Sequence, residues 1–480
     1  MDLRNRNQLS KMKIMTKRSF YLVAILAFMP LLFFSCSKKS NEPKVDQAKY
    51  LAGGKLPAEG ASLPKITNKE HLSLNPEDLP LVSAGNEFNL KLFAQLLQKS
   101  GDANNLVISP LSLETALGMN VLGVSDEAFE EYRNVLGYPH IRSAQDLASY
   151  LKRLTAVITS SGERTCFFPA NSFWLSSKYE QFLLKNYPSL LYDYFDASSA
   201  TLDLSKPESY EVINNWVNRK TYGRIANMLD PKKAKENDAY ALLVNAAFFA
   251  ASWDWNAEKE STKKEIFRNG LGHSENAMMM QIHSQVSTSY AANDRFECLS
   301  VGLVSGETKQ LSDKAPFRML LMLPKEKNAS LSKELPTEKE ILALATDAKV
   351  GTMNIKLPRL DAKLPTLDIT QDLKSLGLVK SLGRPLTHLS RMFDQSFLAD
   401  PTGKYNNKNR GNNVLHQASI KWDEKSVEAA ATTVIEVGVN EPGIDKPSVR
   451  NVVFDRPFFA VILHPKSNKI LFIAAINTLK

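Results

Sequence analysis

The stretch DEKSVEAAATTVIEV, residues 423–437, combines two structural signals that disagree. Its alanine run favours a helix, because alanine is the best helix former. Its alternate positions are apolar or threonine, which is the period of a strand with one buried face. These positions are Val427, Ala429, Ala431, Thr433, Ile435, Val437 and Val439. Glu428 and Glu436 fall on the other face, and the chain continues into GVNEPGIDKPS, rich in Gly, Pro and charge. We therefore predict a segment that suits the inside of a sheet but leads into an exposed loop.

The chain around this stretch predicts an α+β fold. Amphipathic helices are predicted early, in NEFNLKLFAQLLQ (86–98), SPLSLETALGMNVLG (109–123), SDEAFEEYRNVLG (125–137) and PESYEVINNWVNRKTYGRI (207–225). Strand-like runs dominate later, in YALLVNAAFFAASW (240–253), RMLLMLP (318–324), TMNIKLPRL (352–360), VLHQASIKW (414–422) and PFFAVILH (457–464). This order favours a large, mostly antiparallel central sheet. Residues 84–480 contain no linker-like stretch and are predicted to form one domain.

The N-terminus predicts export. Residues 1–19 contribute +5 of the net charge of +9, so the rest of the chain carries only +4, and no nucleic-acid partner is expected. The apolar run FYLVAILAFMPLLFF, residues 20–34, follows this basic start, so residues 1–35 are predicted to be a signal peptide. Cys36 directly follows, where a bacterial lipoprotein carries its acylated cysteine. We expect an exported protein that Cys36 anchors by lipid to the bacterial envelope, with the outer membrane preferred; the alternative is a secreted protein without the anchor.

Residues 36–83 are predicted to be a lipidated N-terminus and flexible tether, because they are polar, rich in Pro and Gly, and without an apolar period. Beyond this tether only Cys166 and Cys298 remain, which excludes a disulfide framework. Two buried free thiols are the expected state.

Motifs for catalysis are missing from the sequence. It contains no HExxH, no CxxC, no Gly-rich phosphate loop and no GxSxG. We therefore predict no enzyme, no cofactor and no metal site. His416 lies within a strand-like run, where a histidine is more often a buried, hydrogen-bonded core group than a catalyst.

Taken together, these segments resemble the serpins, protease inhibitors with a mobile reactive loop. The matching pieces occur in the family's order: NLVISPLSLETALGM (105–119), INNWVNRKTYGRIANML (213–229), ALLVNAAFFAASW (241–253), MNIKLPRLDAKLPTLDITQDLKSLGLVKSL (353–382), VLHQASIKWDEKSVEAAATT (414–433), and VVFDRPFFAVI with ILFIAAI (452–476).

The resemblance implies functional roles by position. A polar "shutter" cluster under the middle of the large sheet would consist of Ser109, Ser112, Asn245 and His416. Trp253 would lie at the "breach", the end of the sheet where loop insertion begins. The "hinge" would comprise Glu424, Lys425, Ser426, Val427, Glu428, Ala429, Ala430, Ala431, Thr432 and Thr433. Two hinge residues depart from the family pattern. Ser426 replaces a glycine, which removes backbone freedom and should slow insertion, whereas Val427 replaces a threonine of similar shape.

The family's count of seventeen residues from the hinge glutamate implies cleavage between Asn440 and Glu441, with cleavage after Val437 or Val439 as alternatives. The bonds after Glu441 and Lys446 precede prolines and are disfavoured.

The implied activity is suicide inhibition by a monomer. A target protease, either an elastase-like or broad serine protease or a cysteine protease, would form a covalent acyl complex before the loop inserts as a new strand. One rival is a non-inhibitory serpin that acts as a binding or carrier module. The other is a hydrolase, which requires a nucleophile–base pair that the sequence does not reveal.

Overall fold

The structure is a computed structural model that describes residues 48–64, 73–162, 166–234, 239–255, 257–284, 288–304, 315–362, 364–382, 386–399, 414–427 and 449–480. Residues Pro43–Lys480 form one compact unit. Its helices, within the described part, are α1 (Leu79–Ser100), α2 (Pro110–Val121), α3 (Asp126–Val135), α4 (Ala144–Thr159), α5 (Asn186–Phe195), α6 (Pro207–Lys220), α7 (Glu338–Asp347), α8 (Thr370–Ser375) and α9 (Gln395–Ala399). The predicted α+β architecture is confirmed.

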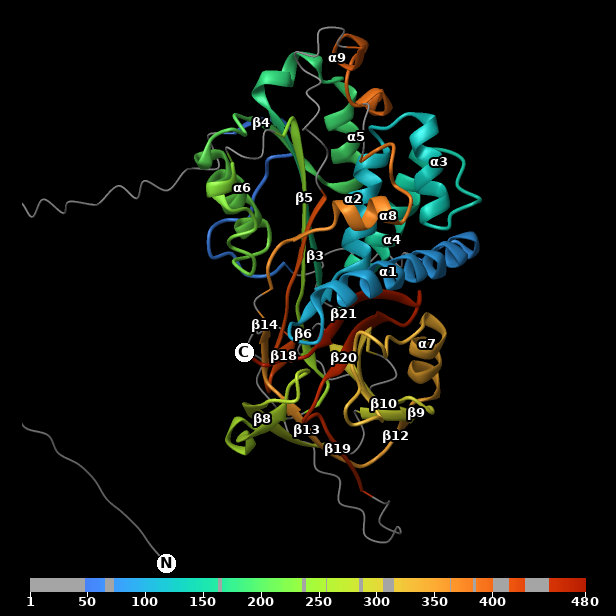
Figure 1. Ribbon diagram of the computed structural model, residues 1–480, viewed down its shortest axis with the longest axis vertical. Helices are drawn as coiled ribbons and strands as arrows, with labels where there is room; N and C mark the ends of the chain where they lie inside the picture. The colour runs from blue at the N-terminus through green and yellow to red at the C-terminus, as the bar shows by residue number, and fades with distance from the viewer. Residues whose placement is uncertain are drawn as a thin grey trace, which may run out of the picture. The chain divides into compact units, whose positions relative to one another are not determined.

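A six-stranded sheet forms the upper half of this unit in Figure 1. Its order is β1 (Lys49–Ala52), β4 (Ser198–Leu202), β3 (Phe167–Ser176), β5 (Ala241–Phe249), β16 (Val414–Ala418) and β15 (Leu367–Asp368). Only β4 with β3 and β5 with β16 pair in parallel, and the other neighbours are antiparallel. The sheet is therefore mostly antiparallel, as predicted.

Two further sheets complete the fold. The larger has the path β14 (Leu360–Ala362), β17 (Ile420–Trp422), β18 (Ser426–Val427), β6 (Ala251–Trp253), β10 (Phe296–Val304), β11 (Phe317–Pro324), β20 (Phe458–His464), β21 (Lys469–Ile476) and β2 (Leu106–Ile108). Off this path, β9 (Thr288–Ala292) pairs with β10 and with β12 (Lys349–Val350). The smaller sheet has the order β19 (Arg450–Val453), β13 (Met353–Pro358), β8 (Ser274–Ser284) and β7 (Lys263–Arg268).

The six-stranded sheet is buried on both faces, because alternate residues of β5 belong to different cores. Leu243 and Ala247 belong to the main core with α2, α4 and α5, whereas Val244 and Ala246 pack in a second core with α6. Figure 1 shows α6 on one side of β5 and α2, α4 and α5 on the other. Strands that are covered on both faces are uniformly apolar, which explains the near-continuous hydrophobic run of β5.

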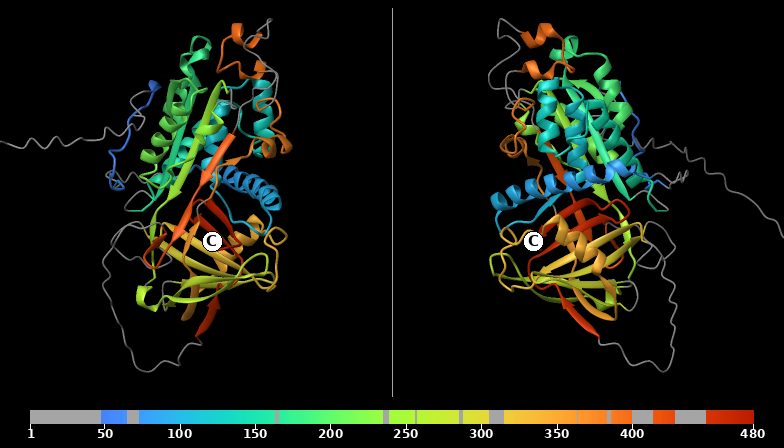
Figure 2. Two further views of the ribbon diagram at one scale, coloured as in Figure 1. Left: turned by 60° about the vertical axis from the view of Figure 1, so that its left-hand side comes forward. Right: turned by 90° about the vertical axis from the view of Figure 1, so that its right-hand side faces the viewer.

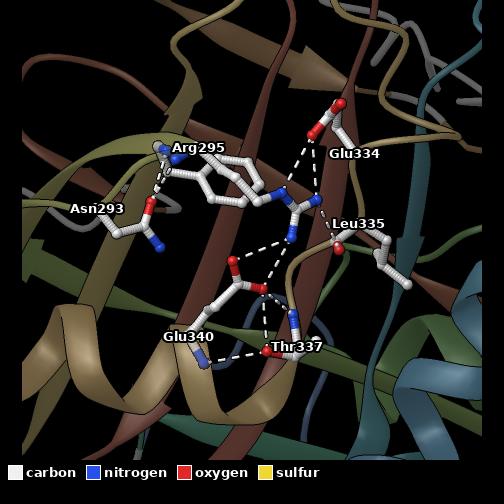
Figure 3. Close-up of polar contacts among 7 residues, drawn as sticks. Asn293, Arg295, Glu334, Leu335, Thr337 and Glu340 are labelled. Carbon is white, nitrogen blue, oxygen red and sulfur yellow. Dashed lines mark hydrogen bonds and ion pairs between the residues drawn. The ribbon is translucent and has the colours of Figure 1, made fainter.

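A polar cluster fixes α7 against the larger sheet (Figure 3). Arg295, in the turn between β9 and β10, donates to Glu340 at 2.9 and 3.0 Å and to Glu334 at 3.1 and 3.3 Å. Burial acts to raise the pKa of Glu340, but hydrogen bonds from Thr337 and the Arg295 charge outweigh it, so this pKa lies below its usual range. Thr337 and Glu340 also form a capping box at the start of α7. This cluster holds the helix in place and suggests no further role.

The expected N-terminal boundary needs correction. Residues 49–52, predicted to belong to a flexible tether, form β1 and pair with β4. The first helix, predicted over residues 86–98, begins at Leu79, before the predicted domain start at residue 84. An existing strand edge can order a polar segment through backbone hydrogen bonds, which composition alone does not reveal. Cys166 and Cys298 are buried thiols that form no disulfide, as predicted.

Candidate functional site

The site lies along the boundary between β5 and β16 and its continuation between β6 and β17, which we call the seam. Over residues 243–247 and 414–418 the two strands pair directly and in parallel, with His416 opposite Asn245. Further along, β6 and β17 do not pair with each other, because β18 lies between them. The seam is therefore closed in its middle and already occupied at one end.

The first residues of the hinge form the strand that fills this end. Ser426 and Val427 pair antiparallel to β6 on one side, and Val427 pairs antiparallel to β17 on the other. Both residues are fully buried. These two residues of the stretch 423–437 therefore lie inside a sheet, as its alternating pattern predicts, and their backbone groups find partners on both neighbouring strands.

A tight turn delivers the chain into this position. The Asp423 carboxylate accepts hydrogen bonds from the amides of Lys425 and Ser426 at 2.9 and 3.1 Å, and the Asp423 amide donates to the Ser426 carbonyl at 3.0 Å. Trp253, expected at the breach, donates from Nε1 to the Asp423 carbonyl at 2.8 Å. Trp253 therefore contacts the turn directly and is more than a core aromatic.

An ion pair holds the hinge glutamate. Glu424 accepts from Arg359 Nε at 2.7 Å and Nη2 at 2.5 Å, and also from the Thr262 hydroxyl. The Glu424 side chain is 6% exposed and that of Arg359 is 30% exposed. Burial acts to raise the pKa of Glu424, but the hydrogen bonds from Arg359 and Thr262 outweigh it and hold the pKa below its usual range. The carboxylate therefore stays charged at neutral pH.

The four predicted shutter residues are brought together under the closed part of the seam. Ser112 donates to Asn245 Oδ1 at 2.5 Å, and the Ser109 amide donates to His416 Nε2 at 3.2 Å. All four are buried. Ser109 is the N-cap residue of α2, but its hydroxyl does not cap the helix and donates instead to the Leu471 carbonyl of β21 at 2.9 Å.

His416 is neutral in this environment. Its Nε2 accepts from an amide, so the proton must be on Nδ1, which has no hydrogen-bond partner among the described residues. Burial lowers the pKa of His416 from 6.5 to about 3. The Nδ1–H group is thus a buried donor without a partner among the described residues, and an unpaired buried donor costs free energy.

Four residues of the site were not predicted. Asn171 extends the shutter, because Asn245 Nδ2 donates to its Oδ1 at 2.8 Å and Asn171 Nδ2 donates to the Phe195 carbonyl at 3.0 Å. Asp423, Arg359 and Thr262 fix the hinge. An aspartate that precedes a turn is a usable sequence signal for Asp423, whereas the other three depend on strand register and on distant contacts.

The remaining predicted residues lie outside the described part of the chain. They are the hinge residues Glu428, Ala429, Ala430, Ala431, Thr432 and Thr433, the cleavage candidates Val437, Val439, Asn440 and Glu441, and the lipidation candidate Cys36. Among the described residues, no three His, Cys, Asp or Glu side chains gather as metal ligands. No helix in the described part is long and apolar enough to cross a membrane.

Comparison with known proteins gives one consistent result. The model of the family "Serpin (serine protease inhibitor)" matches residues 83–479. Iripin-8 of Ixodes ricinus is 27% identical over 409 residues, which cover 83% of this chain and 94% of Iripin-8. Glia-derived nexin of Mus musculus is 27% identical over 406 residues, covering 83% and 94%. The crystal structure of the thermophilic serpin tengpin in its native state has a TM-score of 0.67 at 22% identity and covers 90% of this chain and all of that one.

Proposed function

The chain belongs to the serpin family, whose members are described as serine protease inhibitors, and we propose that it inhibits proteases by insertion of its cleaved loop into the seam. One observation carries the proposal: Ser426 and Val427 already form a strand between β6 and β17, antiparallel to both. A strand that continued from Val427 in the same direction would replace the parallel pairing of β5 with β16 by two antiparallel pairings. Parallel pairing is slightly less stable per residue, so this exchange favours insertion.

The chemistry of the first step belongs to the protease. Its serine hydroxyl or cysteine thiol attacks the carbonyl carbon of the scissile bond, the amine on the C-terminal side leaves with a proton, and an acyl-enzyme remains. Insertion then competes with hydrolysis of this ester or thioester by water. We assign the scissile bond to Asn440–Glu441, with cleavage after Val437 or Val439 as alternatives, which suits elastase-like or broad serine proteases and extends to cysteine proteases.

Insertion is feasible because the face that would become buried has no ionic group. From Val427 onward this face consists of Val427, Ala429, Ala431, Thr433, Ile435 and Val437. Burying a carboxylate among them without a partner would cost several kcal/mol. The two glutamates that follow Val427 within the stretch, Glu428 and Glu436, both fall on the opposite face.

This contrast defines the test. Ala431→Glu should turn the inhibitor into a substrate, because the loop is cut but cannot insert. The matched control is Ala430→Glu, which adds the same charge one residue away on the face of Glu428 and should still inhibit. The measurement is formation of SDS-stable complexes with elastase-like, trypsin-like and cysteine proteases, with mass spectrometry of the released peptide to locate the cut. Equal complex formation by the two variants would contradict the insertion mechanism.

A second measurement separates inhibition from the non-inhibitory alternative. An inserted loop adds a central strand, so the cleaved protein should melt at a higher temperature than the intact protein. Equal melting temperatures would mean that the intact fold stores no free energy, and the chain would then be a binding or carrier module with a serpin fold.

The proposal places the inhibitor at a membrane surface. Support comes from the basic start, the apolar run and Cys36, which fit export and lipid anchoring to a bacterial envelope, with the outer membrane preferred over secretion. We propose that the protein is a monomer and that it needs no cofactor. Incorporation of labelled palmitate that is lost in Cys36→Ala would support the anchor, and unchanged labelling would exclude this residue.

A further inference from the structure

The segment 48–64 precedes the residues that the family model matches, yet it is ordered against the six-stranded sheet. We call it the strap; it is the dark blue segment beside α6 and β4 in Figures 1 and 2. Its first part, β1, pairs antiparallel with β4, the strand that would otherwise form the sheet edge. Gly53 then turns the chain with φ of +70°, and a Cβ at this position would lie 2.9 Å from Ser198 Cα. Only glycine fits that approach.

The strap continues over α6 and is joined to it once through Trp174 of β3 and once directly. The Tyr50 ring lies 6.4 Å from the ring of Trp174 in β3, which in turn meets Trp216 of α6 edge-on at 5.9 Å. Arg219 of α6 donates to the Pro57 carbonyl from Nε at 3.1 Å and from Nη2 at 2.8 Å. Strap, sheet and helix are therefore joined in one layered contact.

The end of the strap is anchored beyond α6. Leu63 packs on a small apolar cluster that includes Phe168 of β3 and Phe248 of β5, whose rings stack 4.4 Å apart, and Tyr222, which follows α6. The strap is thus attached to the sheet on both sides of its contacts with α6.

The helix that the strap holds also covers the seam. The α6 core includes Val244 and Ala246 of β5, and Leu415 of β16 packs against the same core, as do Tyr50 and Leu56 of the strap. A new strand would separate β5 from β16 by about 4.8 Å more than now, the spacing of neighbouring strands. Leu415 and Val244 cannot both keep their contacts with α6 during that separation, so α6 must shift.

We propose that the strap clamps α6 onto the sheet and thereby sets the rate at which the seam opens. The effect on inhibition rests on the proposed function, whereas the clamping of α6 does not. Loss of the strap contacts should speed both opening of the seam without a protease and insertion after cleavage. The strap would then govern how long the inhibitor keeps its uninserted form.

Two glycines of the strap provide a matched test in the full-length protein. Gly53→Ala introduces the clash with Ser198 and should detach the strap, whereas Gly60→Ala, at φ of +69° with nothing within 4 Å, introduces the same backbone strain without a clash. Tyr50→Ala provides a second variant, with the neighbouring Lys49→Ala as its control, because the Lys49 side chain is 68% exposed and forms only a surface ion pair with Glu180, a kind of contact that contributes little.

Hydrogen exchange, monitored by mass spectrometry, is the primary measurement. In Gly53→Ala and Tyr50→Ala, amides of α6 and β16 should exchange about tenfold faster than in their controls, while amides of β20 and β21 keep their rates. That pattern would support the clamp. Equal rates in α6 for each variant and its control, or faster exchange throughout the molecule, would overturn it in favour of a passive or a global structural role.

The rate of spontaneous conversion to a heat-resistant form is the second measurement, and it should also rise about tenfold. The two proposals can fail separately. Wild-type protein that forms no SDS-stable complex, while α6 exchange still depends on Gly53, would refute loop insertion and keep the clamp. If the wild-type protein forms SDS-stable complexes but neither strap variant changes exchange in α6, the clamp is refuted and loop insertion is kept.

Discussion

The middle of the seam and its hinge end are held by different chemistry. In its middle, the shutter joins β5, β16, α2 and β3 through neutral groups that are fully buried. At the hinge, an ion pair between Glu424 and Arg359 lies at the rim, where Arg359 keeps contact with solvent. When the ion pair opens, water can hydrate the partly exposed Arg359, whereas the buried neutral network must exchange its partners together. On the proposed mechanism, the hinge end starts insertion and the shutter limits it.

The largest expected effect is at the shutter. Asn245→Ala removes the oxygen that accepts from the Ser112 hydroxyl and the amide group that donates to Asn171 Oδ1. The Ser112 hydroxyl and Asn171 Oδ1 are then left unpaired in the core. At about 1–3 kcal/mol for each unsatisfied group, we expect a loss of about 4 kcal/mol in the free energy of unfolding, measured in urea at pH 7.5.

Asn276→Ala is the matched control, because Asn276 is an exposed strand residue of β8. It should change the free energy of unfolding by less than about 0.5 kcal/mol. Similar losses in the two variants would mean that the network does not hold the seam.

The second effect is a pH dependence that distinguishes the shutter from the hinge. The pKa of His416 falls from 6.5 to about 3 on folding, because burial disfavours the imidazolium. The unfolded state therefore binds more protons than the folded state between these two pH values. The contribution of His416 to the free energy of unfolding is complete above pH 6.5 and declines as the pH falls toward 3. Between pH 6.5 and 4.5 the contribution of His416 to the free energy of unfolding should fall by about 2 kcal/mol. The hinge should respond only below about pH 4.5, the ordinary pKa of Glu424, because the pKa of this group is lowered.

Unfolding in urea across this pH range provides the measurement. His416→Gln should flatten the slope between pH 6.5 and 4.5. The pKa of buried His464 is also lowered, to about 4, by burial and the nearby Lys466 charge, so His464→Gln is needed to subtract its share. An unchanged slope in His416→Gln would show that His416 already binds its proton in the folded state.

The third effect is smaller and concerns the rim. Glu424→Gln removes the charge that pairs with Arg359 but keeps the side-chain volume. We expect the free energy of opening the hinge to fall by about 1–2 kcal/mol. This is less than the cost of breaking a fully buried pair, because solvent can hydrate the released Arg359. The measurement is hydrogen exchange at the amides of Lys425 and Ser426.

Asp361→Asn serves as control for the rim, since Asp361 lies two residues from Arg359 and forms an exposed pair with Lys421. Exposed pairs contribute less than about 1 kcal/mol. Faster hinge exchange in this control than in Glu424→Gln would contradict the assigned partner.

The sequence predicted which residues lie at the seam better than it predicted their hydrogen-bond and ion-pair partners. Asn245 and His416 follow from the family motifs, but Asn171 joins them only through the register of β3 on β5. Arg359 and Thr262 reach Glu424 from distant parts of the chain, which no local pattern reveals. The strap was mistaken for a tether, because three well-separated apolar residues, Tyr50, Leu56 and Leu63, do not form a period that predicts a strand.

The smallest expected effect tests the position where the chain departs from the family pattern. Ser426 stands where the resemblance implies a glycine, but its φ lies outside the left-handed region, so the folded backbone does not require glycine there. Its hydroxyl is buried without a partner among the described residues. Ser426→Ala should therefore raise the free energy of opening at the Val427 amide, measured by hydrogen exchange, by up to about 1 kcal/mol over wild type. Ser426→Gly should lower the same free energy by about 0.5–1 kcal/mol, because glycine loses more backbone entropy on folding. If Ser426→Gly gave the greatest protection, the serine would strain β18, and the hinge would favour release over the buried position that the structure shows.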